Sequence, residues 1–299
     1  MTIVLRSGDL KAEILEPGTY RGSRFDWTGF IRQVTLLQGG HTFGGVESQV
    51  PGKGSGGLGL CNEFGIDAPL GYEEAEIGGK FPKPGIGLLT RTGEEAYNFF
   101  RPYETEPFPV RTEHGGDFVR FVQDPLPING YAFRLEKEIR VHGAALTISY
   151  ALHNTGGRPI ATNEYVHNFL AIDGMPIGPE YELLYPETVR PEPGANPEQQ
   201  ASLAIEGGRI GWKPGKPRFY ARFLPFAGEA PFYWELRHTA VRAGIRERGS
   251  ERPVRLALWG EPHVVSPEIF VAVAVQPGGV QRWTRTFECF AWQAGGDRE

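Results

Sequence analysis

The sequence predicts an all-β fold with very little helix, and three observations support this prediction. The 299 residues include 41 Gly and 25 Pro without a collagen-like period, which is typical of many short strands joined by turns. The 19 Phe, 11 Tyr and 6 Trp suit the pleated surfaces of a sheet. No segment keeps a 3.6-residue apolar period over three turns, whereas two-residue alternation recurs.

Alternation is clearest at residues 146–152, where large apolar side chains alternate with small or polar ones before turn residues at 153–157. Gly207-Gly208 separates two short apolar runs, so residues 202–210 are predicted to form a hairpin. The best candidate for a short helix is 94–100. Further strands are expected at 218–223, 232–237, 254–259, 269–275 and 283–290.

Composition and loop content favour one domain. Hydrophobic residues make up 40% of the chain and charged residues 22%, which supplies a large core and excludes disorder. A Gly-rich stretch at 51–60 and a stretch rich in Pro and Glu at 186–200 do not separate segments of different composition. We therefore expect residues 1–299 to form a single domain, as all-β sandwiches of this length commonly do.

Charge and cysteine usage narrow the class of partner and the compartment. A net charge of −5 and a pI of about 5.9 argue against nucleic acid or an anionic membrane as the main partner. No apolar run is long enough for a signal peptide or a transmembrane helix. Cys61 and Cys289 are interpreted as free thiols in a reducing compartment, so a cytoplasmic location is expected.

The glycine-rich segment GKGSGG at 52–57 matches the dinucleotide fingerprint G-x-G-x-x-G. That fingerprint requires a preceding strand and a following helix whose N-terminus holds the pyrophosphate. Val50-Pro51 precedes it here, and 58–65 lack helical periodicity, so we reject this interpretation. The HExxH, CxxC and G-x-S-x-G motifs are also absent from the sequence, which lowers the odds of zincin, zinc-ribbon or hydrolase-elbow chemistry.

A histidine, His167, lies inside the extended and partly apolar run TNEYVHNFLAIDG at 162–174. Histidine is the side chain whose unperturbed pKa lies close enough to neutrality to act as acid and base in turn. The amides and acids around it could orient the ring. A half-buried histidine held by a neighbouring backbone group is the alternative interpretation of the same run.

A carboxylate, Glu268, lies in the apolar run VVSPEIFVAVAV at 264–275. Glu is rarely fully buried unless it is paired, so we expect a polar or charged partner for this carboxylate. Partial desolvation would raise the pKa of the carboxyl group toward the range useful for a general base. The alternative is an exposed Glu at the start of a strand, after a turn proline.

These segments resemble the aldose 1-epimerase (galactose mutarotase) superfamily over most of the chain from about Gly29 onward. The resemblance is carried by YAFRLEKEIR at 131–140, LTISYALHN at 146–154 and the His167 run, then by LWG at 258–260, SPEIF at 266–270, QPGG at 276–279 and WTR at 283–285. Each motif is moderately specific, and the resemblance rests mainly on their order and spacing along the chain.

The resemblance implies a galactose mutarotase-like antiparallel β-supersandwich with a sugar bound in an open cleft on one sheet. It implies that His167 is the general acid and Glu268 the general base of anomer interconversion. A carboxylate near O1 and an imidazolium near O5 can open a pyranose ring and reverse their roles on closure. The implied partner is a small-molecule sugar, and no metal, cofactor or covalent intermediate is needed.

The remaining candidate ligands include two departures from the family pattern. His114-Gly115-Gly116 matches a His-Gly-Gly element of a substrate loop, but it comes only a few residues before the predicted strand at 118–122. The arginine of an Asn-Arg-Ile element is missing, because this chain reads NEFGI at 62–66. Asn62 and Glu63 stay candidates for contacts with sugar hydroxyls, as do Asn163 and, for the family's sugar-binding aspartate, Asp173.

A sugar site also needs an aromatic face for the C–H side of the ring. Trp259 is the first choice for this platform, with ordinary core packing as its alternative, and Tyr165 or His263 comes next. Two other functions remain open. One is a sugar-binding sandwich without turnover, and the other is a phosphosugar mutarotase in which Arg101 or the arginines of 242–255 hold a phosphate.

Overall fold

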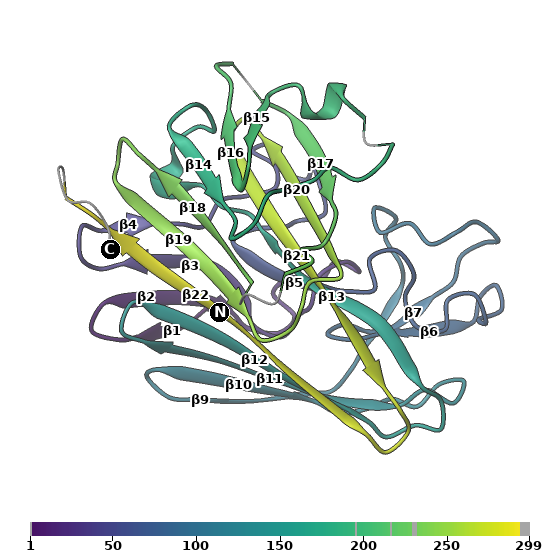
Figure 1. Ribbon diagram of the computed structural model, residues 1–299. Coiled ribbons are helices and arrows are strands. Elements are labelled where there is room, and N and C mark those ends of the chain that lie inside the picture. Colours follow the sequence, from purple (N-terminus) through teal and green to yellow (C-terminus); the bar gives the residue numbers. More distant parts are fainter. Residues whose placement is uncertain (1, 195, 216, 229–231, 294–299) are drawn as a thin grey trace.

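The computed structural model describes residues 2–194, 196–215, 217–228 and 232–293, and consists of two large antiparallel sheets and one small one (Figure 1). The first sheet has nine strands. Their order is β1 (Thr2–Arg6), β2 (Leu10–Leu15), β3 (Phe30–Leu36), β5 (Leu60–Phe64), β13 (Ile160–Asn168), β21 (Val264–Val275), β20 (Arg255–Glu261) and β17 (Phe219–Phe223), with β4 (His41–Thr42) paired to β3.

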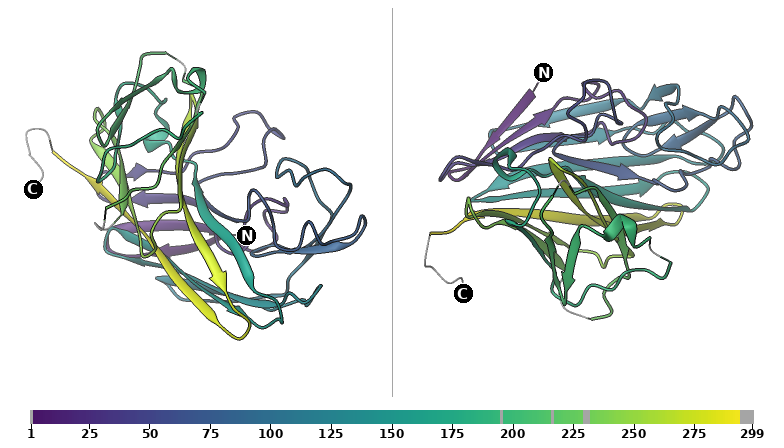
Figure 2. Two further views of the ribbon diagram at one scale, coloured as in Figure 1. Left: turned by 45° about the vertical axis from the view of Figure 1, so that its right-hand side comes forward. Right: turned by 90° about the horizontal axis from the view of Figure 1, so that it is seen from above.

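The second sheet has ten strands and packs across the first (Figure 2). Their order is β15 (Leu203–Glu206), β16 (Arg209–Trp212), β14 (Tyr181–Leu184), β18 (Tyr233–His238), β19 (Ala243–Gly249), β22 (Val280–Ala291), β12 (Ala145–Asn154), β11 (Phe133–His142), β10 (Phe118–Gln123) and β9 (Val110–His114). A small third sheet contains β6 (Lys80–Lys83), β7 (Gly87–Thr90) and β8 (Thr105–Pro107).

The main core lies between the two large sheets and follows the two-residue alternation of their strands. Along β12 every second side chain is buried, which matches the apolar positions of its sequence. β21 differs, because its first eight residues are all buried. It lies at the centre of the nine-stranded sheet, with the core on one face and the side chains of a cavity on the other. A polar residue in this strand is therefore buried on either face.

The prediction of an all-β antiparallel fold is confirmed. The predicted hairpin at 202–210 corresponds to β15 and β16, and the expected strands at 146–152, 218–223, 232–237, 254–259 and 283–290 correspond to β12, β17, β18, β20 and β22. β21 begins at Val264, five residues before the expected start at 269. The expected turn at 153–157 begins later, because β12 continues to Asn154.

The expected helix at 94–100 is wrong, because this segment is irregular in the structure. Its aromatic side chains make tertiary contacts that override local helical preference. Tyr97 stacks on Tyr103, with ring centroids 5.3 Å apart, and Phe99 lies against the Arg24 guanidinium. Helical structure in the described residues is confined to the short 3-10 turns Ile172–Gly174 and Glu198–Gln200, so no helix among them could cross a membrane.

Candidate active site

The register of two central strands brings His167 and Glu268 together. The ladder between β13 and β21 pairs Glu164 with Val271, and continuing this register by three residues places His167 opposite Glu268. Residues directly opposite in an antiparallel pair point to the same face of the sheet. The His167 Nε2 and Glu268 Oε1 atoms are 3.2 Å apart, and each residue is only 4% exposed.

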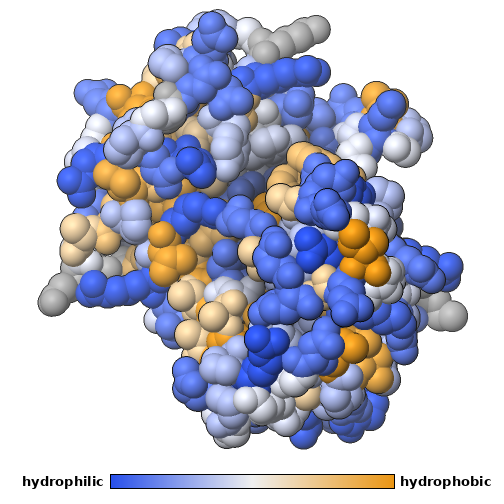
Figure 3. All heavy atoms as spheres, turned by 90° about the vertical axis from the view of Figure 1, so that its right-hand side faces the viewer, coloured by the Kyte–Doolittle hydropathy of each residue, from blue (hydrophilic) through white to orange (hydrophobic). Residues whose placement is uncertain are grey.

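The pair lies in the wall of a cavity of about 550 Å³ on the side of the nine-stranded sheet that faces away from the main core. Figure 3 views the molecule from its right-hand side in Figure 1, where the surface is hollowed near its centre. The lining side chains are contributed by strands of this sheet and by the loops around it. They are Arg24, Glu47, Ile66, Asp67, Phe99, Phe100, His167, Gln199, Tyr220, Arg255, Trp259, Glu268 and Phe270.

Burial shifts the pKa values of the two central groups in opposite directions. It raises the pKa of Glu268 to about 8 and lowers that of His167 well below its ordinary value, because burial penalises the charged form of each. The pair therefore carries a single exchangeable proton at neutral pH. The positive charge of Arg24 lowers both pKa values, as a second and smaller effect.

Ser266 and aromatic rings hold this pair in place. The Ser266 hydroxyl donates to Glu268 Oε1 over 3.2 Å and accepts the backbone N–H of Asn168 over 2.9 Å. The His167 ring stacks on Phe169, with centroids 3.9 Å apart. Trp259 packs nearly perpendicular to the same imidazole, with ring centroids 5.3 Å apart. These contacts leave the ring and the carboxyl group few alternative rotamers.

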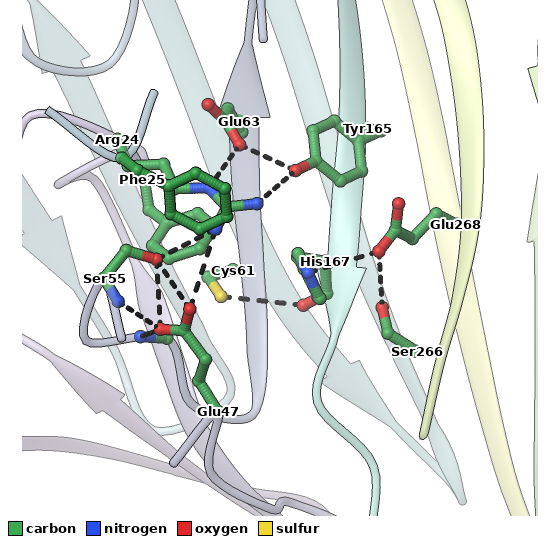
Figure 4. Close-up of polar contacts among 12 residues, drawn as sticks. Arg24, Phe25, Glu47, Ser55, Cys61, Glu63, Tyr165, His167, Ser266 and Glu268 are labelled. Carbon is green, nitrogen blue, oxygen red and sulfur yellow. Dashed lines mark hydrogen bonds and ion pairs between the residues drawn. The ribbon is translucent and has the colours of Figure 1, made fainter. Parts of the chain in front are cut away.

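Arg24 is fixed beside the pair by a buried cluster of charges (Figure 4). Its Nε donates to Glu63 Oε2 over 3.0 Å, and the Tyr165 hydroxyl donates to the same oxygen over 2.6 Å. The Lys83 Nζ donates to the other oxygen, Oε1, over 3.0 Å. Burial alone would raise the pKa of Glu63, but the charges of Lys83 and Arg24 outweigh burial and hold that pKa below its ordinary value.

The glycine-rich segment at 52–57 has a structural role next to Arg24. Glu47 Oε2 accepts the backbone N–H groups of Ser55, over 2.6 Å, and of Gly57, over 3.0 Å. The Ser55 hydroxyl also receives a hydrogen bond from Arg24 Nη1 over 2.9 Å. Gly54 has a φ of +77°, which favours glycine and lets the loop turn around the carboxylate. The loop thereby places Glu47 in the cavity wall.

Comparison with solved structures agrees with this architecture. A galactose mutarotase related enzyme from Lactobacillus acidophilus superposes with a TM-score of 0.62 at 12% identity, covering 97% of this chain and 98% of that one. The GalM/aldose epimerase homologue from C. elegans gives 0.61 at 10% identity, covering 98% and 99%. A galactose mutarotase-like protein from Lactobacillus casei gives 0.59 at 11% identity, covering 97% and 100%.

This chain has the galactose mutarotase-like fold. No family model and no curated protein matches its sequence, so the resemblance stated from the motifs is confirmed by structure at the level of the fold. The fold explains why the motifs are spread along the chain, because the central strands β13, β21 and β20 are far apart in sequence and adjacent in the sheet.

The galactose mutarotase-like fold brings some predicted site residues into the cavity and uses others as supports. Trp259 lines the cavity beside the pair. Glu63 points to the same face but lies behind Arg24, with both carboxylate oxygens bonded to protein donors. Asn62 points to the opposite face, where its amide donates to Glu164 and accepts from Lys137. Asn163 follows the same alternation as His167 and lies opposite Ala272.

Other predicted residues lie elsewhere. His114 ends β9, at the outer edge of the ten-stranded sheet, and borders a separate depression with Val110 and Thr112. Asp173 accepts hydrogen bonds from the Thr42 backbone and from His41 Nδ1, each over 2.8 Å, and so ties the turn after β13 to β4. His263, a second choice for the aromatic platform, contacts the Val46 carbonyl oxygen at 3.0 Å.

Of the thirteen lining residues, His167, Trp259 and Glu268 were proposed from the sequence for the sugar site, and Arg255 was included in the phosphate alternative of 242–255. The other nine were missed, among them Arg24, Glu47 and Tyr220. Only Arg24 had a signal that could have been used. An acidic residue, Glu63, stands where the family pattern has an arginine, and a buried carboxylate at that point calls for a cation from another segment. Within the described residues, no group of three His, Cys, Asp or Glu side chains could hold a metal ion.

Proposed function

We propose that this protein is a mutarotase of the aldose 1-epimerase type, which interconverts the anomers of a sugar by acid–base ring opening and closure. The observation that carries the proposal is the contact of 3.2 Å between His167 and Glu268 in the wall of the cavity. Oppositely shifted pKa values in two neighbouring groups are typical of an acid–base pair.

The chemistry needs one proton moved in each direction. Opening a pyranose removes the proton from the O1 hydroxyl and adds a proton to the ring oxygen O5, and closure on the other face reverses both steps. Because the pKa of Glu268 is raised and that of His167 is lowered, the one proton of the pair rests on Glu268 in the free protein. Once this proton has passed to His167 across their 3.2 Å contact, Glu268 can take the O1 proton while His167 supplies the O5 proton. Each transfer typically contributes ~10²–10⁴-fold to the rate. A protein that only binds sugar has no need of this pair.

The charges in the cavity favour a neutral sugar over a sugar phosphate. Arg24 is committed to Glu63, Ser55 and Tyr165, and Arg255 makes a 2.6 Å salt bridge with Asp67. Glu47 adds a further carboxylate to the lining, so a phosphate group would meet negative charge beside cations that are already paired. Arg101, an alternative phosphate ligand, is engaged with Glu95 at 3.1 Å.

The proposal is tested by following the optical rotation of freshly dissolved α-D-glucose and α-D-galactose with the wild-type protein. We expect equilibration faster than in the protein-free solution for at least one of the two sugars. The control is the same protein after heat denaturation. If neither sugar responds but a hexose 6-phosphate does, the phosphosugar alternative replaces the neutral one, and if none responds the binding-only alternative stands.

The pKa shifts predict an unusual pH profile. The pair carries one proton from well below pH 6.5, where His167 gains a second, up to about pH 8, where Glu268 loses its own. We therefore expect kcat/KM, corrected for the uncatalysed reaction, to stay flat between pH 6.5 and 8 and to fall above that range. If kcat/KM falls as the pH is lowered through 6.5, His167 gains its second proton at its ordinary pKa. That result would contradict the assignment.

Replacement of Arg24 tests its electrostatic role. Because its charge lowers the pKa of both His167 and Glu268, we expect Arg24→Gln to move the alkaline limb of the profile to higher pH. Loss of a charged hydrogen-bond donor near the sugar should also lower kcat/KM by about 10- to 100-fold. Arg101→Gln, which removes an arginine outside this cavity, is the matched control. An unmoved alkaline limb in Arg24→Gln contradicts the prediction.

A further inference from the structure

Several aromatic side chains line the cavity, and they differ in whether a ring face is left uncovered for stacking on a sugar. Phe270 stacks on Tyr165 with centroids 4.3 Å apart, and the Arg255 guanidinium lies 3.7 Å from its centroid, so its faces are occupied. Phe99 is covered by the Arg24 guanidinium at 4.4 Å. Trp259 is partly exposed beside the acid–base pair, where it can meet the ring that reacts.

Two further aromatic residues remain at the outer part of the cavity. Phe100 contacts Phe99, with centroids 4.2 Å apart, and the Arg24 guanidinium lies 5.7 Å from its centroid, yet it stays 67% exposed. Tyr220 is 40% exposed, and both line the same cavity as His167 and Glu268. They come from different elements, since Phe100 lies in the loop between β7 and β8 and Tyr220 on the edge strand β17. Exposing two large rings to water is unfavourable, and such exposed apolar surface commonly marks a binding site.

The size of the cavity also exceeds a single ring. At ~30 Å³ for each water-sized atom, a volume of about 550 Å³ holds roughly 18 non-hydrogen atoms, more than one hexopyranose contains. A disaccharide has more atoms than this, so one of its rings would fill the cavity while the other reached the exposed side chains at its mouth. Phe100 and Tyr220 are the aromatic surfaces available there.

The reaction fixes the direction in which a larger substrate must lie. A mutarotase acts on a free hydroxyl at C1, so the anomeric end must face the buried pair of His167 and Glu268. Any extension must then leave through another hydroxyl, toward the solvent. A negatively charged extension is disfavoured, because Asp67 and Glu47 line the cavity and the arginines beside them are paired. A further glycosyl unit, with its apolar C–H face, has the chemistry that stacks on an aromatic ring.

We propose that the substrate is the reducing-end unit of an oligosaccharide, and that the next glycosyl unit stacks on Phe100 and Tyr220. This inference rests on the proposed function, since it assumes that the reducing end reacts between His167 and Glu268. It assigns to the two exposed rings a role in choosing the substrate and none in proton transfer. Their loss should therefore affect substrates with two sugar units and spare substrates with one.

The test compares mutarotation of maltose, cellobiose, lactose and melibiose with that of glucose. Each of these disaccharides has glucose at its reducing end, so the reacting ring is the same in all five sugars. We expect at least one disaccharide to have a kcat/KM at least tenfold above that of glucose. Phe100→Ala and Tyr220→Ala should each lower this kcat/KM three- to tenfold and leave that of glucose within twofold.

The matched control is Val280→Ala, which shortens an exposed apolar side chain at the start of β22. It should leave the kcat/KM for glucose and for the disaccharides unchanged. The inference is overturned if the kcat/KM for glucose is at least as high as that for all four disaccharides. It is also overturned if Phe100→Ala and Tyr220→Ala lower the kcat/KM for glucose and for disaccharides equally. In either case the mutarotase function itself would stand. If the wild-type protein accelerates neither these five sugars nor galactose, the proposed function fails first and the inference fails with it. If galactose alone responds, the proposed function stands and only the inference fails.

Discussion

Glu268→Gln is expected to lower kcat by two or more orders of magnitude, with little change in KM. Gln keeps the size of the side chain and can still accept the hydrogen bond from Ser266, but it cannot take the O1 proton. His167→Asn should cause a loss of similar size, because it removes the partner of the same proton. The measurement is polarimetry on whichever aldose the wild-type protein processes.

Since the two groups act as a unit, the double variant should be about as slow as the slower single variant. Losses that multiply in the double variant would contradict a shared proton. Glu261→Gln, on the neighbouring strand β20, is the matched control and should keep wild-type activity.

A stability measurement separates lost chemistry from lost folding. The pKa of Glu268 is raised by burial to about 8, so the folded state holds this proton more tightly than the unfolded state. The wild-type group therefore reduces stability as the pH rises from about 4.5 to 8. Glu268→Gln removes this cost, and the variant should be at least as stable as the wild type at pH 8 while it is inactive.

The all-β fold could be predicted because its signal is local, since two-residue alternation reports which face of a strand is buried. The central pair was predicted through the resemblance, because the segments of His167 and Glu268 each have a non-catalytic interpretation and only the order of the motifs along the chain joins them. The rest of the site depends on contacts between segments far apart in sequence. Arg24 precedes β3 in an irregular loop, and its position follows from Glu63 and Tyr165. Loops carry no periodicity from which such contacts could be deduced.

The prediction that Asn62 and Glu63 contact the sugar shows the limit of motif transfer. Adjacent residues of a strand point to opposite faces, so these two cannot serve one site together. Asn62 joins the network between the sheets, and Glu63 holds Arg24. Where the family pattern has an arginine, this chain has Glu63, and Arg24 from an earlier segment bonds to it. A motif search by position would not detect this arginine.

Arg285→Met should give the largest loss of stability, about 3–5 kcal/mol in the free energy of unfolding. Arg285 is 1% exposed and joins two buried carboxylates. Its Nη2 donates to Glu164 Oε2 over 2.8 Å and its Nη1 to Glu247 Oε1 over 2.5 Å. Met fills similar space but leaves both carboxylates without their cation. Asn168, next to His167, is bonded to Glu247, so the damage reaches the strand that carries His167.

Urea denaturation monitored by tryptophan fluorescence measures this loss, and Arg282→Met is its matched control. Arg282 lies on the same strand but is exposed, so its replacement should stay within about 0.5 kcal/mol of the wild type. Arg285→Lys keeps the charge but not the planar guanidinium group, so its loss in the free energy of unfolding should lie between those of Arg285→Met and Arg282→Met. If Arg285→Met lowers the free energy of unfolding no more than Arg282→Met does, the two carboxylates do not depend on this arginine. The strands that carry His167 and Glu268 would then be held by their backbone ladders and by packing, without this ion cluster.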